Sequence, residues 1–480
     1  MKVRAHFFRC VVAGILAACG GGGGPTGPSG PPAVTIVNGA TLPSGPLGAT
    51  VVIQGSNFGT SQAAGSGVVV FTNGAAGPDT ATIASAGDWS NGLIVTTVPA
   101  GAVTGNLVVK TSGGTSTPVT FTVVAKVAFS PSTVSWTSTT ALPVGLSGHA
   151  LAAATLSTGT SVVYVVGGAD STNVPRDTVR YATVTDTGTV GVWSSTTVLP
   201  APRAFAAAAI ATPANSPVTG ASYLYVLGGD STASGKPVAT VYVGTLGVTG
   251  AVTGWTTATP LPAAAHSLGV VIFNGSLYIA GGAGSGNAPL TTVYRAGIQS
   301  DGSLGTWKAE ASLPFARSYF GFGINGTYLY AVGGDSGTVT PNDSSLAASA
   351  INDVVYAQLD VRSGDVTVAG WTANASKLKK AVGKHTAVVA GGTVLVTAGL
   401  YNGATTGATE ETYAGLNADG TTASFNGATG SKTIASAGGG NVFNHAAVGY
   451  LSATGVFHVL VVGGDDVNTP TKKHKGVFYY

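Results

Sequence analysis

The sequence predicts an all-β protein with two folded parts behind a short leader. Only 8% of its 480 residues are charged, and 73 are glycine. An average soluble domain has about 25% charged residues. Apolar residues come in short runs rich in valine, leucine and tyrosine, and glycine or proline separates the runs. Such runs between turn residues are typical of strands, and the chain is too long for one ordinary domain.

Residues 1–19 predict a cleaved leader. A positively charged start precedes an apolar stretch that is too short to span a bilayer, and the stretch ends in Leu16-Ala17-Ala18-Cys19. This ending resembles the lipobox of bacterial lipoproteins, which implies that the Cys19 thiol receives a lipid. The alternative is an ordinary secretory signal with a chance cysteine. Both cysteines of the chain lie in the leader, so the mature protein has no disulfide framework and no thiolate metal site.

Residues 20–32 contain only glycine, proline, serine and threonine, so they predict a flexible tether between the lipid and the first domain. Gly20 stands where lipoproteins that are retained at the inner membrane typically carry aspartate. The resemblance therefore implies an extracytoplasmic, lipid-anchored protein at the outer membrane of a Gram-negative bacterium.

Residues 33–125 predict a small β-sandwich. Apolar and polar residues alternate in five short runs, with turn residues in every interval, at 50–54, 68–71, 93–98, 106–110 and 119–123. Several short strands at this spacing are typical of immunoglobulin-like sandwiches.

Four motifs in this segment strengthen the prediction. The first two motifs flank one apolar run, with Ser44-Gly45-Pro46-Leu47-Gly48 before it and Gly55-Ser56-Asn57-Phe58-Gly59 at its end. The other two are Trp89-Ser90-Asn91 and Val98-Pro99-Ala100-Gly101. In order and spacing these motifs resemble the IPT/TIG family over the whole segment. The resemblance implies an immunoglobulin-like fold that acts as a spacer or stacking module. Large aromatic residues on strands are usually packed, so we expect Phe58 and Trp89 in the core.

Residues 126–480 consist of repeats of about 52 to 65 residues. The clearest marker is a Gly-Gly pair that ends an apolar run, at 167–168, 228–229, 281–282, 333–334 and 463–464, with Ala398-Gly399 at the fifth of the six places. Apolar runs such as 162–166 are typical of strands buried on both faces. Glycine is expected where a strand ends in a tight bend against another backbone.

A second series of markers alternates with the first. Each Gly-Gly strand is followed by a strand with a tyrosine, and a strand with a tryptophan or phenylalanine lies next, at Trp136, Trp193, Trp255, Trp307, Trp371 and Phe425. With the small-residue strand that opens each unit, such as 204–211, this makes four strands a repeat, the pattern of a propeller blade. The pattern resembles kelch repeats.

The order of the markers predicts how the blades of such a propeller close into a ring. The last unit stops after Val477-Phe478-Tyr479 and lacks its fourth strand, whereas the strand at Trp136 has no unit before it. The simplest arrangement places strand 127–143 in the last blade, because closure removes two exposed sheet edges. We therefore expect an immunoglobulin-like β-sandwich followed by a six-bladed kelch-type β-propeller that strand 127–143 closes.

Known chemistries of related folds fit poorly. Copper oxidases with kelch propellers need a cysteine that is crosslinked to a tyrosine. The only cysteine expected in the mature chain is Cys19, which lies at the wrong end of it. Sialidases need an arginine triad with acidic partners, and although Arg203, Arg295 and Arg317 exist, glutamates are scarce. Histidines recur near the start of the first strand of four repeats, at 149, 266, 385 and 445, at intervals that match the repeat rather than a metal site. We therefore expect no enzyme, no metal and no cofactor.

Binding is the remaining function. Kelch partners dock on the loops that enter the first strand and leave the Gly-Gly strand, which by resemblance implies Arg203, Arg317, Tyr319, Lys384, Asn444 and Asp335 as ligand-binding residues. The net charge is +3 and no basic stripe is present, so nucleic acid is not an expected partner. The basic cluster at 472–475 is expected to be a solvated loop.

The sequence thus predicts a secreted, cell-envelope binding or adhesion module for a glycan or an envelope protein. An architectural role in surface assembly and a divergent carbohydrate-active enzyme are the alternatives. The identity of the ligand and the oligomeric state are not predicted.

Overall fold

The computed structural model describes residues 27–75, 77–124, 135–232, 235–341, 349–362, 365–401, 411–427, 434, 442–452, 456–466, 468–469 and 471–480. Cys19, the leader, residues 20–26 of the tether and residues 127–134 of the expected closing strand lie outside them. The described chain is strand-rich with only short helical turns, so the all-β prediction is confirmed. No helix in these ranges is long and apolar enough to cross a membrane.

The N-terminal domain, residues 33–124, has two sheets. The strands of the first lie in the order β1 (Ala33–Val37), β3 (Thr50–Ser56) and β6 (Leu93–Thr97). Those of the second lie in the order β2 (Ser44–Pro46), β9 (Val119–Val124), β7 (Ala102–Thr111), β4 (Val68–Asn73) and β5 (Pro78–Thr80), and β8 (Gly114–Thr115) pairs with β7. The short α1 (Gln62–Gly65) precedes β4.

One buried cluster joins the two sheets of this domain. It includes Val51 and Ile53 of the first sheet and Phe71 and Leu107 of the second. Trp89 and Phe58 lie in this core, as the sequence predicted, and the Trp89 indole N–H donates to the Phe58 carbonyl oxygen at 2.9 Å.

Six further sheets follow in the chain, each with its strands in antiparallel register. The first has β11 (Ala150–Thr155), β12 (Ser161–Val166), β13 (Val179–Thr183) and β14 (Ser194–Ser195). The second has β15 (Ala207–Ala211), β16 (Ser222–Leu227), β17 (Val241–Leu246) and β18 (Val252–Ala258). The third has β19 (Gly269–Phe273), β20 (Ser276–Ala280), β21 (Val293–Gly297) and β22 (Lys308–Ala309).

The fourth sheet has β23 (Gly321–Asn325), β24 (Tyr328–Val332) and β25 (Val354–Asp360), and β25 pairs with both β26 (Thr367–Val368) and β27 (Thr372–Ala373). The fifth has β29 (Thr386–Ala390), β30 (Thr393–Thr397), β32 (Thr412–Gly415) and β33 (Asn426–Gly427). The sixth has β35 (Ala446–Leu451), β36 (Phe457–Val462), β38 (Val477–Tyr479) and β10 (Thr137–Ser138).

The sixth sheet combines both ends of this part of the chain. β10 pairs with β38, with Thr137 opposite Tyr479 and Ser138 opposite Phe478. Trp136 is fully buried beside this pairing, and its indole N–H donates to a carboxylate oxygen of Glu411 at 3.1 Å. The first strands of consecutive sheets contact one another, and β35 contacts β11, so these contacts return to their starting point.

The Gly-Gly pairs end the second strands in a left-handed bend. The φ angles of Gly228 and Gly229 are 60° and 91°, and a Cβ atom at Gly228 would lie 2.2 Å from the Ala265 carbonyl oxygen. Ala398 takes the same position in the fifth sheet and has a φ of 44°. A side chain is disfavoured in this region, which explains why glycine recurs there.

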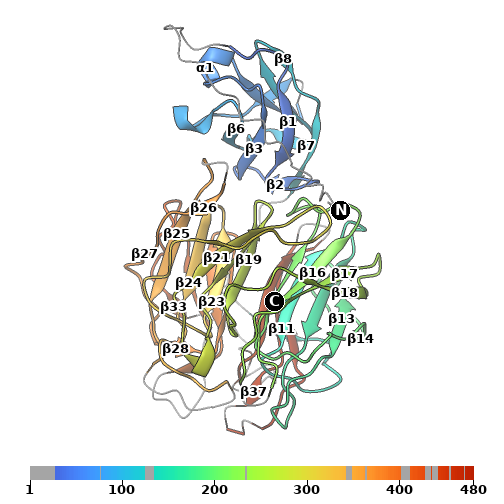
Figure 1. Cartoon of the computed structure of the whole chain (residues 1–480), viewed down its shortest axis with the longest axis vertical. Coiled ribbons are helices and arrows are strands. Elements are labelled where there is room, and N and C mark those ends of the chain that lie inside the picture. Colours follow the sequence, from blue (N-terminus) through green and yellow to red (C-terminus); the bar gives the residue numbers. More distant parts are fainter. Residues whose placement is uncertain are drawn as a thin grey trace, which may run out of the picture.

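The six sheets have two opposite faces (Figure 1). We call the face next to the N-terminal domain the proximal face; it carries the turns between first and second strands, such as 274–275. We call the opposite face the distal face; it carries the loops after the Gly-Gly pairs, such as 335–341, and the short pairs β28 (Val382–Gly383) with β31 (Leu400–Tyr401) and β34 (Val442–Phe443) with β37 (Asp465–Asp466).

The N-terminal domain packs firmly on the proximal face. Val52, Leu93 and Val95 point away from the core of their own domain and belong to one buried cluster with residues of the third and fourth sheets. The Thr41 hydroxyl donates to the Val218 carbonyl oxygen at 2.9 Å, and the Arg362 guanidinium forms an ion pair with Asp88 at 2.6 Å. The domain is therefore attached by an apolar interface as well as by the chain.

Candidate functional site

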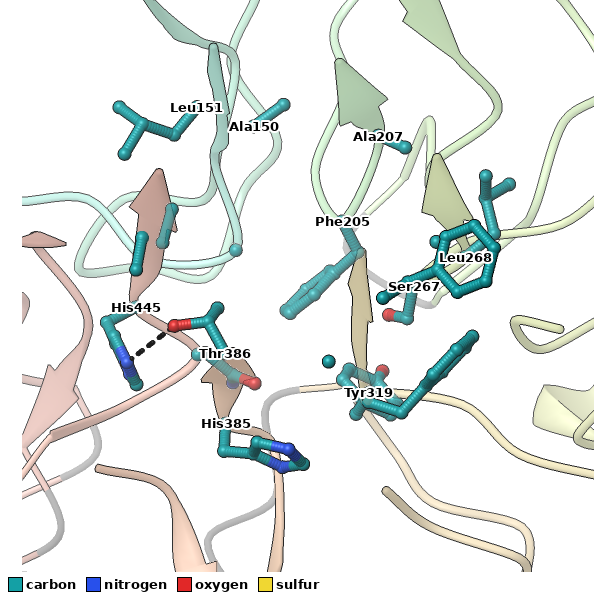
Figure 2. Close-up of a pocket in the computed structure, with 18 of the residues that line it drawn as sticks. Ala150, Leu151, Phe205, Ala207, Ser267, Leu268, Tyr319, His385, Thr386 and His445 are labelled. Atoms are coloured by element: carbon teal, nitrogen blue, oxygen red, sulfur yellow. Dashed lines mark hydrogen bonds between the residues drawn. The ribbon is translucent and has the colours of Figure 1, made fainter. Parts of the chain in front are cut away.

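A cavity of about 210 Å³ lies where the six first strands meet. Each sheet contributes four consecutive residues to its wall, at 148–151, 205–208, 267–270, 319–322, 384–387 and 444–447. Figure 2 shows how side chains at the starts of different sheets, among them Phe205, Tyr319 and His445, surround this space.

The distal end of the cavity is a ring of six residues in the left-handed conformation. They are Gly148, Phe205, Ser267, Tyr319, Lys384 and Asn444, and their φ angles lie between 49° and 55°. This backbone turns the amide N–H of one residue toward the carbonyl oxygen of the residue in the preceding sheet. Five such hydrogen bonds, including the one from Gly148 to Asn444 across the first and sixth sheets, have lengths of 2.5–3.4 Å.

Two of the predicted ligand-binding residues hold a loop of their own chain. The Lys384 ammonium donates to the carbonyl oxygens of Thr340 and Pro341 at 2.9 and 3.3 Å. The Asn444 amide donates to the Pro341 carbonyl oxygen at 2.9 Å. Both side chains are buried, because this loop of the fourth sheet crosses the distal end of the cavity. Their polar groups therefore serve an internal contact.

Tyr319 is buried under the same loop. Its ring packs edge to face on Phe205, with 5.8 Å between centroids, and both rings contact Val339 in one apolar cluster. Burial and the carboxylates of Asp230 and Asp335 raise the pKa of the Tyr319 hydroxyl well above its usual value.

Asp335 and two equivalent carboxylates surround this end of the cavity. Asp230, Asp335 and Asp465 each follow a Gly-Gly pair, and their exposed fractions are at most 2%. Burial raises the pKa of Asp335 to about 6, against the opposing effects of the Lys384 charge and the Ser349 hydroxyl. Burial alone raises the pKa of Asp230 to about 7.

The two predicted arginines lie inside the sheets. The Arg317 guanidinium is fully buried and donates to the Gly333 carbonyl oxygen at 3.1 Å; burial lowers its pKa to about 10. The Arg203 guanidinium donates to the Tyr242 hydroxyl at 3.1 Å and lies 4.9 Å from the centroid of that ring. Neither arginine presents its charge to the distal surface.

The repeating histidines are buried and neutral. Burial lowers the pKa of His149, His266 and His385 to about 4 and that of His445 to about 3. His385 Nε2 contacts the Val332 carbonyl oxygen at 3.1 Å, and His445 Nε2 lies 3.0 Å from the Thr386 hydroxyl (Figure 2). Within the described ranges no three histidine, aspartate, glutamate or cysteine side chains are grouped as metal ligands.

The six predicted residues therefore divide into three groups. Tyr319, Lys384 and Asn444 line the cavity, Asp335 lies beside them, and Arg203 and Arg317 lie within the sheets. The sequence did not predict the loop at 339–341, which covers Tyr319, Lys384 and Asn444. It also did not predict Arg176 and Arg180, which line a second cavity, a groove on the distal face.

Comparison with known proteins adds no relative. No protein-family model matches the chain, and no curated protein matches it.

Proposed function

We propose that this chain is a lipid-anchored protein of the bacterial cell envelope that binds a glycan or an envelope protein through its distal face. In this proposal residues 126–480 form a six-bladed kelch-type β-propeller, and residues 33–125 form an IPT/TIG-like sandwich that holds the propeller away from the membrane. The protein binds rather than catalyses, and Cys19 carries the lipid.

The arrangement of the six sheets supports the propeller. Their first strands contact one another in a cycle, and their ring residues share backbone hydrogen bonds across the first and sixth sheets. β10 provides the fourth strand of the sixth sheet. The markers in the sequence lie at equivalent places in the sheets, with a tyrosine on each third strand and an aromatic residue at or just before each fourth strand.

The main support for the binding function is that the distal face points away from the end of the chain that would carry the anchor. Residues 27–32, the end of the tether, pack beside α1 and β8, where Asn57 donates to the Pro31 carbonyl oxygen at 3.3 Å. Figure 1 shows α1 and β8 at the end of the N-terminal domain that is farthest from the six sheets. An anchor before residue 27 therefore leaves the distal loops outermost, while the N-terminal domain covers part of the proximal face.

Blocking one face at a time tests this function. The two leader cysteines are the only ones in the sequence, so a new cysteine gives a selective attachment point for polyethylene glycol. Thr338→Cys places the polymer on the loop over the cavity, and Thr187→Cys places it on an exposed turn of the proximal face. The full-length chain, purified in detergent, is screened on a glycan array and against a solubilised envelope extract.

The function is supported if the chain binds a glycan, or an envelope protein that binds again after purification, and if polymer at Thr338→Cys blocks this binding while polymer at Thr187→Cys does not. The function is contradicted if the chain binds no glycan and no envelope protein. Equal blocking by both polymers contradicts the assignment to the distal face.

A further inference from the structure

A groove of about 600 Å³ runs along the distal side of the seam, by which we mean the junction between the sixth and first sheets. Residues 144–146, which follow β10, line it. Arg176 and Arg180 from the first sheet and the loop before its third strand also line it, as do Lys472 and Lys475 of the last loop. Ligand pockets are typically between about 300 and 1,000 Å³ in volume, so the groove has room for a ligand of one or two sugar units.

Two of the cations in this groove are uncompensated. Arg176 forms an ion pair with Asp170, and Lys472 lies 3.6 Å from a carboxylate oxygen of Asp466. Among the described residues, no carboxylate forms an ion pair with Arg180 or with Lys475.

Asp170 is the one carboxylate among the residues that line the groove, and its charge is compensated. Burial opposes ionisation of Asp170, but hydrogen bonds from Thr172 and Arg176 lower its pKa to about 2. Asp465 is buried and accepts from Lys473 and Asn444. An anion in the groove therefore meets two free positive charges, and no uncompensated carboxylate is among the residues that line it.

This concentration of charge is unusual for this chain. The leader holds three basic residues, and the rest of the sequence holds 18 basic and 18 acidic residues, so the mature chain is formally neutral. Free cations that face one groove on a neutral protein attract anions locally rather than over the whole surface.

The other groups in the groove suit a sugar. Ser171, Thr178 and Thr471 line it beside the charges, and so does Val144, with 47% of its surface exposed. A sugar acid presents a carboxylate, several hydroxyls and an apolar ring face, and the planar fork of arginine can hold a carboxylate with two hydrogen bonds. A lipid phosphate or an acidic peptide could also bind the cations, but neither combines a carboxylate with several hydroxyls on one apolar ring.

We propose that the groove at the seam binds an acidic sugar unit of an anionic polysaccharide, with Arg180 and Lys475 as the residues that contact its charged group. The proposal rests on the glycan-binding function above and names the class of glycan. The site exists only in the closed ring, because its lining residues follow β10 or belong to the first and sixth sheets and their loops.

The groove is tested by titrating the full-length chain with polygalacturonate, which carries carboxylates, and with dextran, which is neutral. We expect polygalacturonate to bind and dextran not to bind. Arg180→Gln and Lys475→Ala should each raise the Kd for polygalacturonate about tenfold, because each removes a charge-assisted hydrogen bond. Raising the ionic strength should weaken binding, because both cations face solvent.

Lys236→Ala is the matched control, because Lys236 is an exposed cation on a distal loop of the second sheet, away from the groove. It should leave the Kd within about twofold. Equal losses from Lys236→Ala and Lys475→Ala would overturn the proposal, since they would indicate general attraction to a basic face. Unchanged affinity in Arg180→Gln and Lys475→Ala would overturn it as well.

Two further outcomes separate this proposal from the function on which it rests. Binding to phosphatidylglycerol vesicles but not to polygalacturonate would overturn the sugar and indicate a membrane surface. Binding of a neutral glycan or an envelope protein in the polymer-blocking experiment, with no affinity for polygalacturonate, would overturn the acidic-sugar site and leave the distal binding function intact.

Discussion

Asp230 of the second sheet and Asp465 of the sixth occupy the same place in the repeat but have opposite surroundings. Both follow a Gly-Gly pair, and both pair with the residue before a ring residue, Ala204 or Phe443. Asp465 accepts hydrogen bonds from Lys473 and Asn444. Neither carboxylate oxygen of Asp230 has a hydrogen-bond partner among the described residues.

This difference shows which properties the repeat determines. The repeat fixes the backbone and the burial of the carboxylate, whereas its electrostatic balance depends on side chains from other loops. A buried carboxylate is tolerated when a cation compensates it, and otherwise its pKa rises until it is neutral. The second and sixth sheets show these two solutions in one molecule.

The largest expected effect comes from removing the cation of the compensated pair. Lys473→Met leaves Asp465 buried with only the Asn444 amide, and breaking a buried pair in this way costs about 3–5 kcal/mol. The change in the free energy of unfolding of the full chain, measured by guanidinium denaturation at pH 7, checks this. The double variant Lys473→Met, Asp465→Leu should recover most of the loss, and a double variant no more stable than the single one would contradict it.

Asp230→Asn tests the uncompensated carboxylate. Its pKa rises from 3.8 to about 7 on folding, so the folded state binds this proton more tightly than the unfolded state. Stability is therefore lost as the pH rises from about 4 to about 7, by about 1.4 kcal/mol for each unit and by at most about 4 kcal/mol.

We accordingly expect Asp230→Asn to match the unchanged protein near pH 4 and to exceed it increasingly up to pH 7, in thermal unfolding measured across this range. Asp186→Asn, which removes a carboxylate from an exposed proximal turn, is the control. A stability difference of the same size at both ends of the range would show that ionisation of Asp230 does not destabilise the fold.

The smallest expected effect extends the comparison to the fifth sheet, where Ala398 replaces the first glycine of the pair. Its φ of 44° is unfavourable for a residue with a Cβ atom, so Ala398→Gly should stabilise the protein by about 1 kcal/mol. The reverse change, Gly463→Ala, should destabilise it, because the new Cβ atom would lie 2.6 Å from the Leu146 carbonyl oxygen. Thermal unfolding of both variants checks these two predictions. A loss of stability in Ala398→Gly would contradict the conclusion that the backbone of Ala398 is strained.

Much of the fold was predictable because its signals are local. Runs of β-branched and aromatic residues predicted the strands, and the all-β class is confirmed. The packing of the N-terminal domain on the third and fourth sheets was missed, although Val51-Val52-Ile53 and Leu93-Ile94-Val95 carried its signal. Consecutive apolar residues on a strand indicate burial on both faces.

The candidate site was harder to predict, because its geometry depends on contacts between sheets. The six ring residues share a left-handed backbone but belong to six different residue types, so no residue preference reveals them. Lys384 and Asn444 resemble surface residues in the sequence, and their burial depends on contacts with other sheets, such as the loop at 339–341 and Asp465. The groove at the seam joins residues about 300 positions apart, so its charges do not appear together in the sequence.

The position of β10 has a mechanical consequence. This strand links the N-terminal domain to the six sheets, and it enters the sixth sheet from the proximal side. Under the proposed function, tension between a membrane anchor and a ligand held on the distal face would pull β10 roughly along its own length. Its hydrogen bonds to β38 and the buried Trp136 indole would then resist together in shear instead of separating one after another, so a strand of two residues can hold against more force than its length suggests.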